Sequence, residues 1–363
     1  MSQFETRRDQ LRKALRKSGV DAMLVTNYTN VTYLTGFTGD DSYLLLTPKE
    51  AIVISDPRYT TQLEEECPGL ELETREPGVP ILESVSKLIK RCKAQKLGVE
   101  STSITMAVFQ AIRDKLVGTE LVGLSQAVEE LRMIKDKEEI ERIRRAGVQA
   151  ARAIDVIRAS LTPDMTERQV AADLEHQIRR FGGKGCSFPP IVAVGTRAAL
   201  PHARPTERRI GEADFVLIDW GANEGLYASD LTRVYATGKI SPKLQKIYRV
   251  VLQAQLAGIE AIRPGVSCEE VDKAARSVIV KAGYGPQFGH GLGHGIGLEV
   301  HEAPRLARNQ QTVLRPGMVV TVEPGIYLPD WGGVRIEDDV LVTRTGYEVL
   351  TSVPKELEQC VIG

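Results

Sequence analysis

The sequence has no excess charge of one sign, because its 47 basic and 48 acidic residues leave a formal net charge of −1 over 363 residues. Proteins that bind nucleic acid or an anionic membrane surface by general electrostatics carry a clear positive excess. Long apolar runs are also missing. The first segment, MSQFETRRDQLRKALRK, is typical of a charged amphipathic helix rather than a secretion signal. We therefore expect neither a nucleic acid nor a membrane as partner.

Cysteine is scarce and its few copies show no paired spacing. The five residues are odd in number, which gives no basis for a disulfide framework. They are Cys67, Cys92, Cys186, Cys268 and Cys360. We expect reduced thiols, mostly buried, and a cytoplasmic location.

The length of the chain exceeds one typical domain, so two are expected. Up to about residue 130, short apolar segments at 22–25, 43–46 and 52–54 alternate with charged helical segments, which predicts a small α/β domain. A long helix then begins, with Asp136 and Glu139 in capping positions. We predict an N-terminal domain over residues 1–130 and a second domain over 131–363.

The second domain contains an internal repeat. LTPDMTERQVAADL (161–174) matches IRPGVSCEEVDKAA (262–275), each with a proline, then a Thr or Ser N-cap and a Gln or Glu three residues later. A hairpin that carries two carboxylates follows each helix. Two αβ halves that each donate two acidic groups predict a pseudo-two-fold domain with a site on the seam.

The first carboxylate pair lies in DFVLIDWGANEGLYASDLTRVY, where apolar runs flank Asn223-Glu224-Gly225. This pattern is typical of a β-hairpin. A turn centred on Glu224 and Gly225 would place Asp219 directly opposite Asp230, with Cβ atoms about 5 Å apart. Like charges in this position are destabilising unless something neutralises them.

The second pair lies in MVVTVEPGIYLPDWGGVRIEDDVLVT, where Glu323 and Glu337 flank a bend and are an even number of residues apart, so they can share a face. Before them, FGHGLGHGIGLEVHE has glycine at every second position from 289 to 297, and at about 1 kcal/mol each these glycines disfavour a helix. As extended chain, the segment places His290 and His294 on one face with bare backbone behind them. Convergence of these groups predicts a hydrolase with two metal ions.

Four strings in this order, IDWGANEGLYASDLTR, GHGLGHGIGLEVHE, VEPGIY and GVRIED, resemble the pita-bread metallopeptidases that cleave Xaa-Pro bonds, the aminopeptidase P and prolidase family. NYTNVTYLTGF and SDPRYTTQ resemble that family's creatinase-type N-terminal domain. The resemblance covers essentially the whole chain. It implies an α/β (α+β) fold, with a smaller creatinase-type domain and a pita-bread catalytic domain of pseudo-two-fold αβ halves. It also implies a homodimer.

The resemblance makes Asp219 a ligand of one divalent ion and His294 and Glu323 ligands of the other, with Asp230 and Glu337 bridging. Coordination by oxygen with one nitrogen favours Mn or Co, with Zn or Fe as alternatives. Two such ions activate water and stabilise a tetrahedral intermediate.

Three further histidines, His202, His290 and His301, match the family's non-ligand histidines, which bind the scissile carbonyl or the oxyanion. Glu323 matches the group that carries a proton to the leaving nitrogen. His176 lies outside this set.

The candidate substrate contacts are Phe188, Arg305, Tyr327 and Arg335. Arg305 matches an arginine that in prolidases meets the C-terminal carboxylate of a dipeptide, and a loop charge is the alternative. Arg335 could hold a ligand carboxylate or be a surface arginine. Phe188 and Tyr327 could line a proline pocket or pack in the core. The expected substrates are small proline-containing peptides, whose Xaa-Pro amide lacks the N–H that a general peptidase cleft requires.

Three rival functions remain open. A methionine aminopeptidase would share the five ligands and His301, but needs no N-terminal domain of this size and no Arg335. A creatinase-like hydrolase without metals would have lost the acidic set, and a non-catalytic pita-bread binding module typically loses ligands. Within the favoured function, a dipeptidase and an aminopeptidase for longer peptides are both compatible with the sequence.

Overall fold

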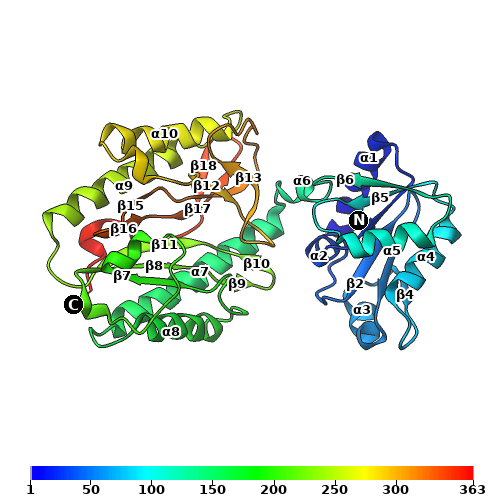
Figure 1. The fold of residues 1–363 in the computed structure, drawn as a ribbon, viewed down its shortest axis with the longest axis horizontal. Helices are drawn as coiled ribbons and strands as arrows, with labels where there is room; N and C mark the ends of the chain where they lie inside the picture. Colours follow the sequence, from blue (N-terminus) through cyan, green and yellow to red (C-terminus); the bar gives the residue numbers. More distant parts are fainter. Residues whose placement is uncertain (1, 363) are drawn as a thin grey trace. The chain divides into compact units, whose positions relative to one another are not determined.

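The computed structural model describes residues 2–362, and the chain divides into two compact units between Arg132 and Met133 (Figure 1). Among the described residues, no helix combines the length and the apolar character that crossing a bilayer requires. All five cysteines are free thiols.

The N-terminal unit is built on a six-stranded mixed sheet with strand order β4-β3-β2-β1-β5-β6. The apolar segments expected as strands are confirmed as β1, β2 and β3. Apolar residues of α4 and α5 pack with those of β1, β3 and β5 in one core. The strands are β1 (Ala22–Val25), β2 (Ser42–Leu46), β3 (Ala51–Ser55), β4 (Glu71–Thr74), β5 (Lys96–Glu100) and β6 (Glu120–Leu124), and the helices are α1 (Gln3–Ser18), α2 (Tyr28–Thr35), α3 (Thr60–Glu66), α4 (Ile81–Cys92), α5 (Met106–Lys115) and α6 (Glu129–Arg132).

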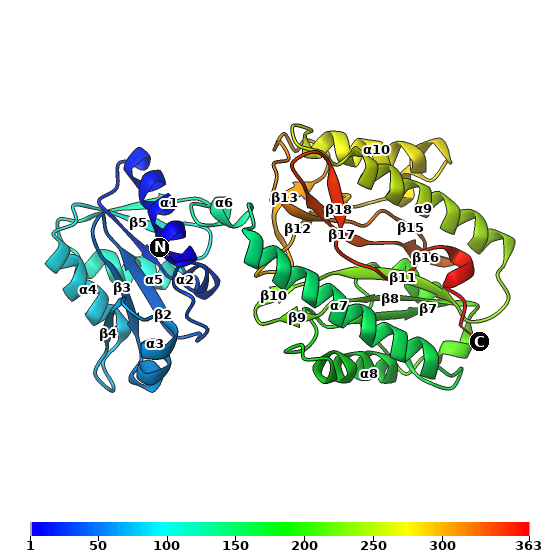
Figure 2. The same ribbon diagram turned by 180° about the vertical axis from the view of Figure 1, so that it is seen from behind.

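Four helices enclose the strands of the C-terminal unit: α7 (Lys137–Ser160), α8 (Glu167–Arg180), α9 (Pro242–Ala261) and α10 (Cys268–Lys281). The α7 and α8 helices lie on one side and α9 and α10 on the other, in both views (Figures 1 and 2). The expected capping boxes are present at Asp136 for α7, Thr166 for α8 and Ser267 for α10. The internal repeat is therefore a repeat of helix pairs.

The strands of the C-terminal unit form a three-stranded sheet, β11-β8-β7, a five-stranded sheet, β13-β12-β14-β17-β18, and two short hairpins, β9/β10 and β15/β16. Their bounds are β7 (Ile191–Val194), β8 (Phe215–Trp220), β9 (Asn223–Glu224), β10 (Tyr227–Ala228), β11 (Leu231–Ala236), β12 (Gly293–Gly295), β13 (Glu302–Leu306), β14 (Val319–Val322), β15 (Gly325–Leu328), β16 (Gly332–Arg335), β17 (Asp338–Val342) and β18 (Tyr347–Val349).

The β8 strand is buried on both faces, which explains its unbroken apolar sequence. Val216 and Ile218 pack with α7 and α8, whereas Leu217 belongs to the core that includes α9 and α10. Because side chains alternate along a strand, Asp219 leaves β8 on the same face as Leu217. That face is directed toward the seam between the halves.

Candidate metal centre

The first carboxylate hairpin has a different register from the one expected. Asp219 lies opposite Thr232, and Glu224 pairs with Tyr227, so the turn falls at Gly225 and Leu226. The prediction that Asp219 faces Asp230 directly was therefore wrong by two residues. Asp230 lies just before β11 and is the diagonal neighbour of Asp219. Because a shift of two residues keeps the face of a strand, both carboxylates still point the same way.

The second carboxylate pair lies in the interval between two ladders. Val322 pairs with Asp338 in β14/β17, and Gly325 pairs with Arg335 in β15/β16. Glu323 and Glu337 thus fall opposite one another, each at the end of a strand. Both residues lie where the ladder of hydrogen bonds is interrupted, and their side chains are on the same face.

The glycine-rich segment is extended, although only Gly293–Gly295 is paired as the strand β12. This strand lies between β13 and β14. A Cβ on Gly293 would come within 2.0 Å of the Thr321 carbonyl oxygen, and one on Gly295 within 2.2 Å of the Ala303 carbonyl oxygen. Glycine is required on both sides of His294 because the neighbouring backbones occupy the space of a side chain.

The His294 ring is oriented by its own backbone. Its Nδ1 lies 3.0 Å from the Gly295 carbonyl, so Nδ1 carries a proton and donates it there. Nε2 then faces the carboxylates, 3.3 Å from Glu323 Oε1 and 3.9 Å from Asp230 Oδ2. A ring nitrogen fixed in this way among carboxylate oxygens is suited to hold a metal ion.

The carboxylates are held close together and away from water. Burial, followed by the charges of Glu337 and Asp219, raises the pKa of Asp230 well above its ordinary value. Burial and the charges of Glu323 and Asp219 do the same to the pKa of Glu337. Burial also raises the pKa of Glu323, but its hydrogen bond to His294 and the neighbouring positive charges reverse this, and the net shift is downward.

The donor set fits a divalent cation. Asp230, His294 and Glu337 each offer one ligand atom, and these atoms all lie within 4.8 Å of one another. The Oδ1 atoms of Asp219 and Asp230 are buried and have no hydrogen-bond partner in the described part of the chain. An unpaired buried carboxylate oxygen is costly, and a cation would supply the missing partner.

A chain of hydrogen bonds runs from Asp219 to His290. Arg335 donates to Asp219 Oδ2 and, through Nη1, to the Tyr327 hydroxyl oxygen at 2.8 Å. The hydroxyl has one proton, which it donates to His290 Nε2 at 3.0 Å. His290 in turn donates from Nδ1 to the Gly291 carbonyl at 2.7 Å and is therefore neutral. Burial lowers the pKa of His290, in agreement with this form.

Thr232 was missed by the sequence reasoning. It occupies the position opposite Asp219, donates from Oγ1 to Glu337 Oε2 at 2.6 Å, and accepts from Arg335 Nε at 3.0 Å. It thereby links the two hairpins. The only sign in the sequence that Thr232 belongs to the site was its position two residues after Asp230, on the same face of the strand.

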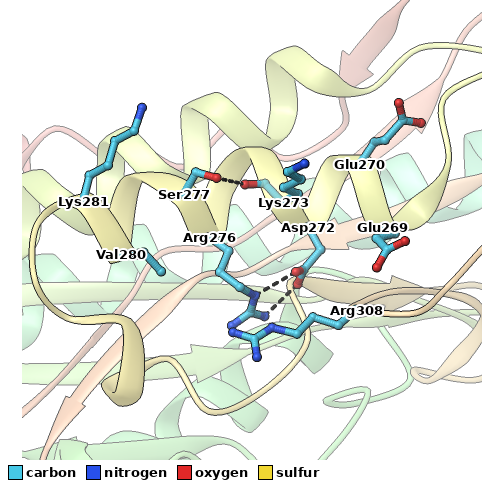
Figure 3. Close-up of a pocket in the computed structure, with 9 residues that line it drawn as sticks. All are labelled: Glu269, Glu270, Asp272, Lys273, Arg276, Ser277, Val280, Lys281 and Arg308. Atoms are coloured by element: carbon cyan, nitrogen blue, oxygen red, sulfur yellow. Dashed lines mark hydrogen bonds and ion pairs between the residues drawn. The ribbon is translucent and has the colours of Figure 1, made fainter.

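An ion pair on α10 anchors the segment that carries His290. Arg276 donates twice to Asp272 and reaches the carbonyls of Phe288 and His290, at 3.0 and 2.7 Å. Asp272 also accepts the Leu292 backbone N–H at 3.1 Å. The pair lines a groove along α10 (Figure 3). Sequence reasoning missed this pair, which positions the His290 backbone from the helix side.

The remaining candidates differ in their exposure. His202, His301 and Arg305 are exposed, and Phe188 is half-buried. The His301 ring lies 4.4 Å from the His294 ring, and Arg305 is the cross-strand neighbour of His294. The pKa of His301 is lowered mainly by the partial burial of its ring, and further by the charges of His294 and His202. His301 and Arg305 therefore lie beside the half-buried His294.

His290→Ala is expected to leave the metal content of the protein at the wild-type level and to lower the turnover of a reaction at this site by on the order of 10², because the ring contacts Tyr327 rather than the Asp230, His294 and Glu337 cluster. Steady-state kinetics and elemental analysis of the purified variant check this. His176→Ala, on the helix α8, should change neither quantity. If His290→Ala behaved like His176→Ala, His290 would have no role in the site.

Comparison with known proteins identifies the family of the chain. Residues 141–344 match metallopeptidase family M24, and residues 7–134 match the creatinase/prolidase N-terminal domain. The chain belongs to metallopeptidase family M24. It therefore combines a creatinase-type N-terminal α/β domain with the pita-bread catalytic domain of the M24 fold, as the resemblance implied. M24 enzymes generally bind a pair of metal ions, and the cluster of Asp230, His294 and Glu337 is the candidate site in this one.

Several solved structures and known sequences are similar over nearly their whole length. The solved Xaa-Pro dipeptidase from Bacillus anthracis is 42% identical with a TM-score of 0.95, covering 99% of both chains. The X-Pro aminopeptidase from Thermotoga maritima is 35% identical with a TM-score of 0.87, covering 93% of this chain and 97% of its own. The Xaa-Pro dipeptidase of Pyrococcus horikoshii is 37% identical, covering 94% of this chain and 95% of its own.

Proposed function

We propose that this M24 peptidase is a metal-dependent hydrolase that cleaves the Xaa-Pro bond of dipeptides or short peptides. The observation that carries the proposal is the cluster of Asp230, His294 and Glu337, whose ligand atoms lie within 4.8 Å of one another. Glu323 and Asp219 border this cluster, and similar proteins are named as Xaa-Pro dipeptidases and an X-Pro aminopeptidase. A homodimer, inferred from the family resemblance, is part of the proposal and can be tested by light scattering.

In the proposed site, Asp219 would help to hold one divalent ion and His294 and Glu323 the other, and Asp230 and Glu337 would be shared between the two. Two divalent ions here would activate a water molecule and stabilise the charge that develops on the substrate carbonyl oxygen. The oxygen-rich donor set favours Mn, with Co or Zn as alternatives. Arg335 and Thr232 keep Asp219 and Glu337 in position through the hydrogen bonds described above.

The chain's own groups would handle the substrate and the protons. Glu323 Oε1 lies next to the metal cluster and would carry a proton from the attacking water to the leaving nitrogen. His301, whose ring lies next to that of His294, and His202 would bind the scissile carbonyl or the oxyanion. His290 would act with the Tyr327 hydroxyl, since the two are hydrogen-bonded.

Selection for proline would come from shape and from the missing N–H of the substrate amide. The Tyr327 ring is half-buried beside His290, and Phe188 is half-buried before β7. We assign both to the pocket for the proline ring. A methionine-aminopeptidase-like activity would instead require a pocket for the side chain of an N-terminal methionine residue, which none of these contacts favours.

The experiment that tests the function is an assay of matched peptides: Xaa-Pro, Xaa-Pro-Yaa and the corresponding Xaa-Ala peptides, with metal-free protein reloaded with Mn, Co or Zn. We expect cleavage of the proline peptides alone, with Mn or Co most effective. Cleavage of Met-Ala peptides would favour the methionine-aminopeptidase alternative. Metal binding without cleavage of any peptide would favour a non-catalytic binding module.

Arg305→Ala tests whether the enzyme recognises the end of a dipeptide. Arg305 is exposed and lies opposite His294 on β12/β13, within reach of a carboxylate next to the metal cluster. Loss of a charge-assisted hydrogen bond should reduce kcat/KM for Xaa-Pro by roughly 2 to 3 kcal/mol, tens to hundreds of fold. An Xaa-Pro-Yaa tripeptide has an amide at that point and should lose much less. Equal losses on both substrates would make the aminopeptidase the better assignment.

A further inference from the structure

Asp339 is a fifth carboxylate beside the metal cluster. It lies on β17 two residues after Glu337, and its side chain is fully buried. Its Oδ2 accepts the backbone N–H of Asp230 at 3.0 Å. Its Oδ1 is one of the buried oxygens for which the described part of the chain provides no hydrogen-bond partner.

The residue opposite Asp339 on β14 also contacts the proposed ligands from the side of the sheet. This residue is Thr321, whose Oγ1 accepts the His294 backbone N–H at 3.1 Å and lies 3.3 Å from Glu323 Oε1. Thr321 therefore contacts two proposed ligands, His294 and Glu323, and Asp339 contacts a third, Asp230. The opposed pair Thr321/Asp339 lies directly beneath the opposed pair Glu323/Glu337.

The hydrogen bond to the Asp230 backbone does not explain why residue 339 is a carboxylate. A neutral threonine or asparagine could also accept the Asp230 N–H. A buried carboxylate with one unpaired oxygen is costly, and the neighbouring carboxylates increase the cost by repulsion. A cation close by would offset both costs. The charge of Asp339 therefore has a function only when the cluster holds ions.

We propose that Asp339 is a positioning residue of the metal centre. Its Oδ2 fixes the backbone of Asp230 across the seam between the halves, and its charge strengthens the binding of cations on the side of Asp230 and His294. This inference rests on the metal centre of the proposed function. Groups that orient metal ligands from behind typically contribute about 10-fold to 100-fold in metal affinity.

Asp339→Asn separates the charge from the hydrogen bond, because the amide oxygen can still accept the Asp230 N–H. We expect the affinity for Mn or Co, measured by equilibrium dialysis, to fall by about 10-fold to 100-fold. The melting temperature of the metal-free variant should equal or exceed that of the metal-free wild type, because the amide oxygen still accepts the Asp230 N–H and the amide cannot ionise. Asp339→Ala loses the hydrogen bond as well and should bind the metals more weakly still.

Glu167→Gln is the control, because Glu167 is an equally buried carboxylate at the start of α8 whose oxygens accept the Val194 and Thr206 N–H groups. Glu167 differs from Asp339 in its ion pair with Arg197. The Glu167→Gln variant should keep the wild-type metal affinity. An Asp339→Asn variant with wild-type affinity would overturn the inference and, if its metal-free form also melted lower, would give Asp339 a purely structural role. A wild-type protein that binds no metal would instead refute the proposed function itself.

Discussion

Asp230→Asn and Glu337→Gln are each expected to lose both metal ions and to lower kcat/KM by about three orders of magnitude or more, because all contacts of the ions with the transition state disappear together. Both carboxylates lie in the cluster with His294, and each is proposed to bridge the two ions. Elemental analysis of the purified variants and peptide assays measure the two losses. His294→Ala should also lose metal, although His294 is proposed to contact only one of the two ions.

His176→Ala serves as the control, since His176 is exposed on α8 and takes part in none of the site contacts described above. It should retain the wild-type metal content and activity. The decisive opposite result is full activity after exhaustive chelation, with the loss of metal confirmed by elemental analysis. That result would exclude the proposed mechanism whatever the variants do.

The metal-free protein is expected to lose stability as the pH rises from about 5 to above 8. Burial raises the pKa of Asp230 and Glu337 well above the ordinary value, and raises the pKa of Asp339 to about 8. In the unfolded chain these groups ionise near pH 4. Between these values the folded state binds more protons than the unfolded state, so the free energy of unfolding falls with rising pH.

The histidines and Glu323 modify this prediction without reversing it. The lowered pKa values of His290 and His301 stabilise the folded state as the pH rises toward their ordinary value near 6.5, which offsets part of the loss at the acidic end of the range. Burial lowers the pKa of His294, but its interactions with Glu323 raise the pKa more, and the net shift is upward. The protonated ring therefore stabilises the folded state at low pH, and this stabilisation is lost as the pH rises. The net pKa of Glu323 is lowered, which affects stability only at more acidic pH, below the ordinary pKa of a glutamate.

Thermal unfolding of the chelated protein between pH 5.5 and 8.5 measures the effect. One unit of pKa shift in one group corresponds to about 1.4 kcal/mol, and several shifted groups predict a drop in melting temperature on the order of 5 to 10 °C. The metal-loaded protein should lack this slope above about pH 6.5, because bound cations keep the carboxylates ionised in the folded state. Equal slopes in both forms would contradict the assignment of the shifts to an empty metal cluster.

The sequence by itself determined those features that depend on neighbouring residues. The capping boxes of α7, α8 and α10 are present at Asp136, Thr166 and Ser267, because a cap is made by residues three positions apart. Glycine on both sides of His294 excluded a helix, and the even spacing of Glu323 and Glu337 allowed them to share one face. The family resemblance, carried by short strings, also came from the sequence.

Tertiary structure alone decided the register and the partners of the site. The turn at Gly225 and Leu226 replaced Asp230 by Thr232 opposite Asp219, because register follows from turn geometry and from packing on both faces of β8. The pairings of Arg335 with Asp219 and of Asp339 with the Asp230 backbone join residues more than 100 positions apart. Such contacts have no local pattern in the sequence, since they arise only when the two halves of the domain pack against each other.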